Sequence, residues 1–261
     1  MRISSLGQTV LATTIVALGI QGLIQGDFAA IWQPVPKSLP ARDVLAYVCA
    51  FVLLGTGMGL LWQRIAAAAA RVLLVYLLLW LLLLRLPDTF PAPTVLGSWY
   101  GCAETTVIMA AVWVLYAWLA PGLDRRRLHF ATGDQGVRIA RMFYGITLVF
   151  FGASHFIYLD LTTPLVPGWL PAHTFWAYFF GCTYIAAGMA VLARAYARLA
   201  VALSALQMGL FTLLVWVPLV AASHTSASNW HELVISWTLT ASAWVMADSY
   251  RDVAWLAVRK R

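Results

Sequence analysis

The residues of this chain that could do chemistry are a few ionisable side chains within long apolar segments. An ionisable group inside a membrane-spanning segment is costly, and such groups commonly mark functional positions. His155 lies well inside one apolar segment, and Glu104 lies about one turn inside another. His231 and Glu232 stand together at the start of the last apolar segment. These four residues are therefore candidates for a site that binds a ligand or handles protons.

His155, His231 and Glu232 are expected to form one cluster between their two segments. A histidine titrates near neutral pH, and a carboxylate can orient it for proton transfer. The alternative for each residue, Glu104 included, is a hydrogen bond that holds two membrane helices together. A zinc site would need a third or fourth ligand, and His173 is the only nearby candidate, so no metal site is predicted.

The loop before residue 174 is too apolar for an ordinary solvated loop. It carries Trp169 between Pro167 and Pro171, and His173 follows. We expect it to fold back onto the membrane surface. It is either a lid over a pocket, which makes Trp169 and His173 candidate ligand contacts, or part of an interfacial aromatic belt with residues 175–180.

Other reactive side chains do not suggest a site. Cys49, Cys102 and Cys182 have no metal-type spacing and are expected to be small buried residues. Arg85 and Asp88 flank Pro87 at a segment end and are expected to pair or to extend toward the membrane surface. No phosphate-binding loop, nucleophile elbow or zinc-protease helix is present in the sequence.

The composition is that of a polytopic membrane protein. Hydrophobic residues make up 62% of the 261 residues and charged residues 10%, and the mean hydropathy is +0.81. Soluble domains are nearer one quarter charged. The net charge of +7 lies at segment ends, so it indicates membrane topology and not nucleic-acid binding. Eight segments are long enough to span a membrane: 8–26, 43–62, 65–86, 99–119, 138–159, 174–192, 197–221 and 230–256.

The chain contains an internal repeat. The motif at 35–41 recurs at 166–172, and the same offset of 131 pairs Gly57 with Gly188 and Pro87 with Pro218. Trp99 and Trp113 likewise pair with Trp230 and Trp244. Only the first segment departs from this register, where an offset of 130 pairs Gln25 with His155. The predicted fold is all-α: eight transmembrane helices as two parallel four-helix bundles, 1–120 and 138–261, joined by a linker at 121–137.

The basic residues predict the orientation. Fourteen of the 17 Lys and Arg residues fall on one side of the eight segments, and Lys37, Arg42 and Arg85 fall on the other. Positive residues favour the cytoplasmic side, so both termini are predicted to be cytoplasmic. The candidate site residues then lie toward the outer leaflet.

The second half resembles the DoxX-like family of small four-helix membrane proteins. The resemblance implies a bacterial inner-membrane location and an association with quinone-coupled redox complexes. It rests on these segments within 141–248: 151–156 (FGASHF), 165–171 (LVPGWLP), 175–181 (FWAYFFG), 185–190 (IAAGMA), 230–232 (WHE) and 243–248 (AWVMAD).

Three functions follow as hypotheses. The first is a redox-associated subunit that binds a quinone or lipid-like molecule near the outer leaflet. It would receive electrons from a partner protein, since the chain has no haem, flavin or iron–sulfur motif. The second is a binding or transport protein for a small apolar or lipidic substrate. The third is a structural or assembly factor of a membrane complex. In all three hypotheses the protein is in contact with membrane lipid.

Overall fold

In a computed structural model, the chain is a bundle of helices. The structure describes residues 5–32 and 35–258, and no strand occurs among them. The α-helices are α1 (Leu6–Gln25), α2 (Arg42–Leu61), α3 (Ala66–Trp80), α4 (Tyr100–Leu119), α5 (Gly122–Arg127), α6 (Gly133–Ile157), α7 (Leu159–Thr162), α8 (His173–Ala193), α9 (Ala197–Phe211), α10 (Val217–Ala222) and α11 (Ala227–Asp248). Shorter 3-10 or π turns are η1 (Ala30–Trp32), η2 (Leu81–Arg85), η3 (Pro87–Thr89), η4 (Leu96–Trp99), η5 (Thr163–Leu165) and η6 (Thr212–Trp216).

Seven helices in the described ranges are long and apolar enough to cross a membrane, which makes this a multi-pass membrane protein. Four of the seven are the single helices α1, α2, α6 and α8, and the other three are composite. The segment Leu96–Leu119 joins η4 and α4. The segment Ala66–Thr89 joins α3, η2 and η3, while Ala197–Ala222 joins α9, η6 and α10. The eighth expected segment forms α11, which has 22 residues but is more polar and is not one of the seven. The helix α6 begins at Gly133, within the predicted linker of 121–137.

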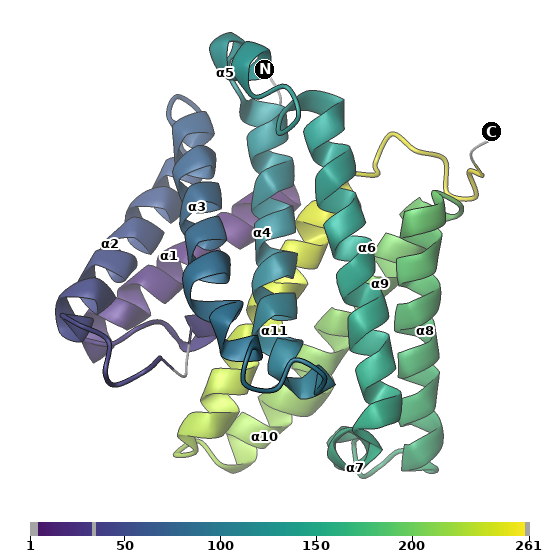
Figure 1. Cartoon of the computed structure of the whole chain (residues 1–261). Helices are drawn as coiled ribbons and strands as arrows, with labels where there is room; N and C mark the ends of the chain where they lie inside the picture. Colours follow the sequence, from purple (N-terminus) through teal and green to yellow (C-terminus); the bar gives the residue numbers. More distant parts are fainter. Residues whose placement is uncertain (1–4, 33–34, 259–261) are drawn as a thin grey trace.

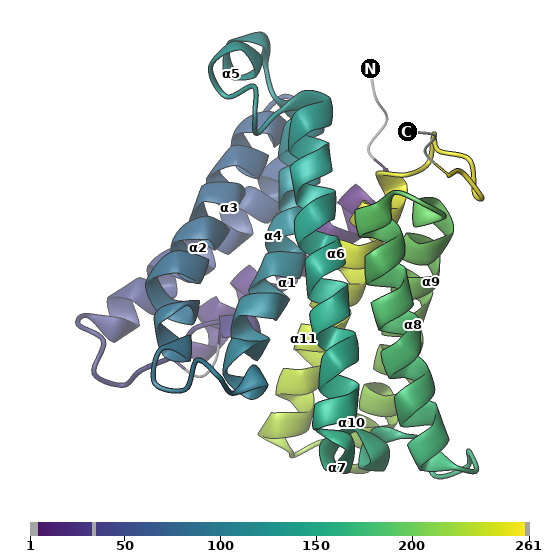
Figure 2. The same ribbon diagram turned by 45° about the vertical axis from the view of Figure 1, so that its right-hand side comes forward.

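The helices surround a central pair, α4 and α11. Figures 1 and 2 show α2 and α3 on one side of this pair and α6, α8 and α9 on the other, while α1 crosses behind α3 and α4 in Figure 1. The helix α4 packs against α3, α6 and α11, and α11 packs against α1, α4 and α9. The short helix α5 projects beyond one end of the bundle (Figure 2). The candidate residues on α4 and α11 therefore lie on the two helices where the halves meet.

The second and third helices of the two halves begin at positions that differ by the predicted offset of 131. The helix α8 begins at 173 and α2 at 42, α9 begins at 197 and α3 at 66, and η6 begins at 212 and η2 at 81. Both π turns end two residues before a proline, Pro87 or Pro218. A proline removes one helical hydrogen bond and crowds the preceding turn, and a π turn relieves that crowding.

The first helix follows a different offset from the predicted 130. A Cβ on Gly19 would lie 2.5 Å from the Leu54 nitrogen, and one on Gly152 would lie 2.8 Å from the Ile185 nitrogen. Leu54 and Ile185 are 131 apart, whereas Gly19 and Gly152 are 133 apart. The offset of 130 is therefore wrong for this helix pairing, and Gly22, not Gln25, lies where His155 lies in the second half.

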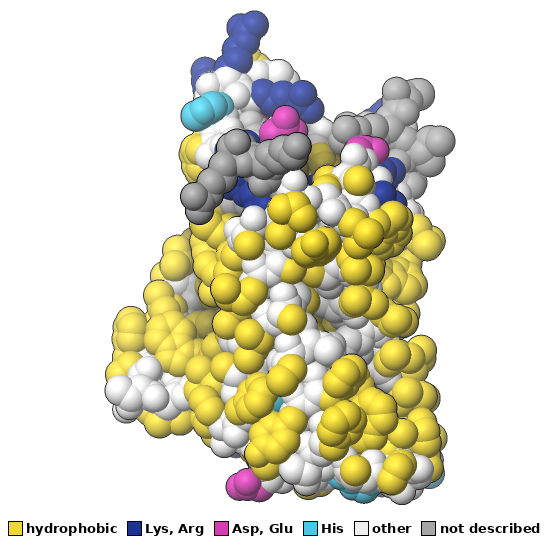
Figure 3. Space-filling model, turned by 90° about the vertical axis from the view of Figure 1, so that its right-hand side faces the viewer, with side chains coloured by type: hydrophobic (Ala, Val, Ile, Leu, Met, Phe, Trp, Pro, Cys, Tyr) yellow, Lys and Arg dark blue, Asp and Glu magenta, His cyan; other side chains and the backbone are white. Residues whose placement is uncertain are grey.

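The surface is apolar along the helices and basic at one end. Figure 3 shows hydrophobic side chains covering most of one face of the molecule, with Lys and Arg gathered at its upper end. Many large apolar side chains are exposed, among them Leu83 on η2 and Leu203 on α9. An apolar exterior of this kind suits lipid. Of the basic residues predicted to be cytoplasmic, Arg2, Arg259, Lys260 and Arg261 lie outside the described residues.

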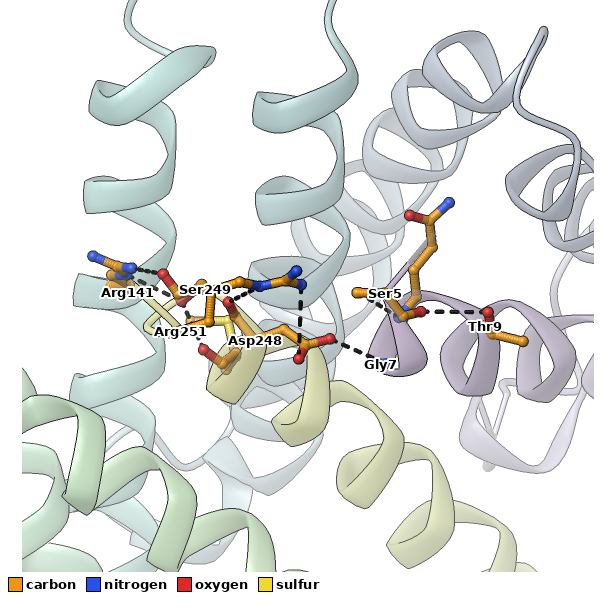
Figure 4. A network of polar contacts seen from close by, with 9 residues as sticks. Ser5, Gly7, Thr9, Arg141, Asp248, Ser249 and Arg251 are labelled. Atoms are coloured by element: carbon orange, nitrogen blue, oxygen red, sulfur yellow. Dashed lines mark hydrogen bonds and ion pairs between the residues drawn. The ribbon is translucent and has the colours of Figure 1, made fainter. Parts of the chain in front are cut away.

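A polar network fixes the central helix at the basic end (Figure 4). The Asp248 carboxylate at the end of α11 accepts a hydrogen bond from the Gly7 backbone nitrogen of α1 at 3.1 Å. Arg141 of α6 donates to the side chain and to the carbonyl of Ser249, and its guanidinium lies 3.7 Å from the ring centroid of Tyr250. Burial raises the pKa of Tyr250, and the neighbouring arginine opposes that shift. The network joins α1, α6 and α11.

Candidate functional site

Arg85 is buried inside the bundle. It ends the π turn η2, is only 8% exposed, and donates from Nη2 to the Ile31 carbonyl at 2.9 Å. Its guanidinium lies over Gly101 of α4, because a Cβ there would come within 3.2 Å of Arg85 Nη1. The expectation that Arg85 extends to the membrane surface is therefore wrong. The π turn and the missing side chain at Gly101 together make room for it.

Glu104 lies on the same face of α4 as Gly101, three residues further along. Residues three apart on a helix are neighbours, so Glu104 lies on the Arg85 side of α4. The Glu104 carboxylate interacts electrostatically with both Arg85 and Glu232. Within the described ranges, no hydrogen bond or ion pair within 4 Å reaches this carboxylate. Glu104 is thus a half-buried acid held near a guanidinium but not neutralised by direct contact.

Glu232 and His231 of α11 lie near Arg85 and Glu104. Both side chains are half-buried in the first two turns of α11. His231 interacts electrostatically with Arg85, as Glu232 does with Glu104. We call Arg85, Glu104, His231 and Glu232 the charged cluster. It draws residues from η2, α4 and α11, at the end of the bundle opposite the basic end.

The segment between α1 and α2 closes one side of the charged cluster. Phe28, Ile31 and Trp32 are almost completely buried, and η1 packs against α11. The Trp32 ring packs at a tilt against that of Trp80 on α3, with ring centroids 4.7 Å apart. An ion pair of 2.8 Å between Asp27 and Arg42 holds the base of this segment. The cluster therefore has an apolar aromatic wall beside its charges.

His155 belongs to a different group of residues from the one predicted. Its Nδ1 lies 2.8 Å from the Phe151 carbonyl of its own helix, and its ring centroid lies 5.7 Å from that of Tyr184 on α8. No hydrogen bond or ring contact in the described ranges joins it to His231 or Glu232. The structure does not show the predicted cluster of His155 with those two residues. The helix α6, which carries His155, packs most closely against α8.

Trp169 and His173 lie in the loop before α8 and at its first residue. The loop is partly helical, with α7 and η5, and Trp169 is 70% exposed. His173 is half-buried. In the described ranges, neither side chain makes a hydrogen bond, ion pair or ring contact with the charged cluster. Their candidate role as ligand contacts stays a prediction.

The remaining reactive groups are dispersed. No group of three or more His, Cys, Asp or Glu residues with metal-binding geometry occurs among the described residues. Cys49 and Cys102 are buried, Cys182 is exposed, and all three are free thiols. Cys182 was predicted to be buried but is exposed, because its side of α8 faces away from the bundle.

Chemically, the charged cluster combines hydrogen-bond donors with proton carriers. Arg85 supplies fixed positive charge and donors, His231 can donate or accept, and Glu104 and Glu232 can take up or release protons. Arg85 was missed as a site residue in the sequence. The available signal was a charged residue directly after four leucines, in a segment that must cross the membrane.

Comparison with protein-family models, with curated proteins and with solved structures finds no match to this chain.

Proposed function

We propose that this protein is an eight-span membrane protein that binds a lipophilic molecule with a polar headgroup at the charged cluster, with a quinone as the ligand class. The observation that carries the proposal is the position of Arg85 over Gly101, one turn from Glu104 on α4, with Glu232 on α11, which packs against α4. Charged groups at such a position are expensive unless they serve a function.

The eighth span is α11. Twenty-two residues correspond to about 33 Å of helix, which is enough to cross a bilayer core. Its polar residues Ser236, Thr238, Thr240 and Ser242 are buried between helices and need no lipid-compatible side chain. Because α11 is central, a helix more polar than its neighbours can still span the membrane.

The coincident helix boundaries support two copies of one four-helix unit, related by an axis along the membrane normal. With the basic end placed at the cytoplasm, the charged cluster lies in the outer leaflet. The resemblance of the second half to the DoxX-like family supports a bacterial inner membrane and a redox partner protein that supplies electrons.

A quinone headgroup suits the chemistry of the charged cluster. Its carbonyl oxygens accept hydrogen bonds, which Arg85 or His231 can donate. Its reduction takes up protons, which Glu104 and Glu232 can carry. The aromatic wall formed by Trp32 and Trp80, together with the apolar helix exteriors, suits the ring and the isoprenoid tail.

The test is binding of a short-chain ubiquinone to the full chain in lipid nanodiscs, measured by isothermal titration calorimetry. Glu104→Gln and Glu232→Gln keep the side-chain shape and remove the charge. Each should weaken binding of the reduced form of the same ubiquinone at least about tenfold, because the hydroxyls of the reduced form donate to these carboxylates and hydrogen bonds to charged groups contribute roughly 1.5–3 kcal/mol.

The matched control is Asp160→Asn, an exposed acid at the same end of the bundle, which should bind as the natural chain does. Saturable binding that the two Gln variants lose supports the proposal. If the natural chain binds no quinone, or if the Gln variants bind equally well, the cluster only supports helix packing and the proposal is wrong.

A further inference from the structure

The interior of the second half holds a line of polar side chains that the charged cluster does not use. At the basic end, Arg141 lies against the ring of Tyr250. One turn along α6, Tyr144 is completely buried, and its hydroxyl lies 3.0 Å from the Ser204 hydroxyl of α9. Arg141 and Tyr144 are three residues apart on α6 and therefore lie on one face of that helix.

The line continues through α8 and α9 in the middle of the bundle. Gln207 lies one turn beyond Ser204 on α9 and donates to the Phe180 carbonyl at 3.2 Å. Its amide oxygen accepts a hydrogen bond of 2.7 Å from Thr183. Tyr184 follows Thr183 on α8, and its buried phenol lies beside Gln207. The amide thus orients the hydroxyl groups on either side.

At the outer end the line meets His155 and then α4. The His155 ring lies 5.7 Å from that of Tyr184. Because Nδ1 faces the Phe151 carbonyl, that nitrogen carries the hydrogen and Nε2 is left to accept a proton. Ser154, the preceding residue of α6, lies beside Tyr100, and Tyr100 is four residues from Glu104 on the same side of α4. The line therefore ends at the charged cluster.

We propose that these side chains form a proton route through the second half, from the charged cluster to the basic end. Each hydroxyl accepts a proton on its oxygen and releases its own to the next group, and His155 accepts and returns one at Nε2. Steps longer than a hydrogen bond pass through a bridging water. The route needs no quinone and so stands apart from the proposed ligand.

The competing account is that these groups only hold helices together, as polar side chains do in many membrane bundles. Tyr→Phe substitution separates the two accounts because it keeps the ring and its packing and removes only the hydroxyl. The chain also offers matched controls in Tyr178 and Tyr196, which are exposed on the outside of the bundle.

The experiment measures proton entry into liposomes that hold the full chain and a trapped pH-sensitive dye, driven by a potassium diffusion potential. The natural chain should acidify the interior faster than protein-free vesicles. Tyr144→Phe and Tyr184→Phe should lower the rate to that of protein-free vesicles, while Tyr178→Phe and Tyr196→Phe leave it unchanged.

Thermal unfolding and quinone titration of the same variants complete the test. If Tyr144→Phe fails to fold, Ser204→Ala removes the partner of the same hydrogen bond and should also lower the rate. A variant that still binds quinone but conducts no protons separates the route from the ligand site. The proposal is overturned if the natural chain conducts no faster than protein-free vesicles, or if the Phe variants conduct as it does.

Discussion

At the scale of the residue, burial decides what each charge can do. Arg85 donates to the Ile31 carbonyl and lies over Gly101, so neutral backbone groups help to fix its position. Glu104 and Glu232 interact with each other and are kept in place by α4 and α11. The guanidinium is the only fixed positive charge in the charged cluster, so its loss leaves two acids in a poorly solvated site.

We predict that Arg85→Leu destabilises the protein by roughly 3–5 kcal/mol, since removing one member of a buried charged group leaves the others uncompensated. The triple variant with Glu104→Gln and Glu232→Gln should recover much of this loss. Arg71→Leu is the control. It removes an exposed ion pair with Asp124 and should cost about 1 kcal/mol or less.

The measurement is unfolding in mixed micelles with increasing denaturing detergent. Equal stability of the single and triple Arg85 variants would show that Arg85 does not offset the charge of the two acids.

At the scale of the element, close helix contacts depend on absent side chains. Gly152 of α6 faces Gly181 and Ile185 of α8, and a Cβ at Gly152 would approach the Gly181 carbonyl oxygen to 2.6 Å. Because that neighbour is backbone, it cannot rotate away. Gly55 on α2 has nothing within 4 Å and lies on the outside.

We predict that Gly152→Leu destabilises the protein by about 1–3 kcal/mol, the usual effect of overpacking. Gly55→Leu should be neutral within experimental error. Thermal unfolding in the same detergent compares the two, and a similar midpoint for both variants would contradict the α6 and α8 contact.

The hydrogen bond from the Gly7 nitrogen to Asp248 joins α1 to α11, and a substitution can test it. Asp248→Ala removes the acceptor for the Gly7 nitrogen and should cost about 0.5–2 kcal/mol, as the loss of a helix cap does. Asp252→Ala, at an exposed position four residues later, should have no effect. Hydrogen exchange of the first turn of α1 should rise in the first variant only. Unchanged exchange there would argue against the cap.

At the scale of the whole molecule, the question is whether α11 crosses the membrane. In a chain with all three cysteines replaced by serine, single cysteines at Ser226 and Asp252 lie before and after this helix. We predict that a membrane-impermeant reagent labels Cys at 226 from outside intact spheroplasts, and Cys at 252 only in inverted vesicles.

A cysteine at Arg126 of α5 should label as the one at 252 does, because both lie at the basic end. Labelling of positions 226 and 252 from the same side would remove α11 from the spanning helices and, with it, the eight-span arrangement.

The sequence by itself determined that the chain is helical and embedded in a membrane, because runs of about 20 apolar residues leave few alternatives in lipid. It also placed the helices within a few residues and showed the offset of 131, since prolines and glycines mark helix ends locally. Glu104, His231 and Glu232 were recognisable as candidates because they are ionisable residues in apolar segments.

Only the tertiary structure decided which of these residues meet. The partner of each side chain depends on which helices pack together, and that follows from glycine contacts and π turns that change the rotation of a helix. Arg85, which was expected at the membrane surface, lies in the charged cluster. His155, which was expected in a cluster with His231 and Glu232, packs against Tyr184. A shift of two or three residues along one helix, as in α1, changes which side chain faces inward, and periodicity alone does not fix that register.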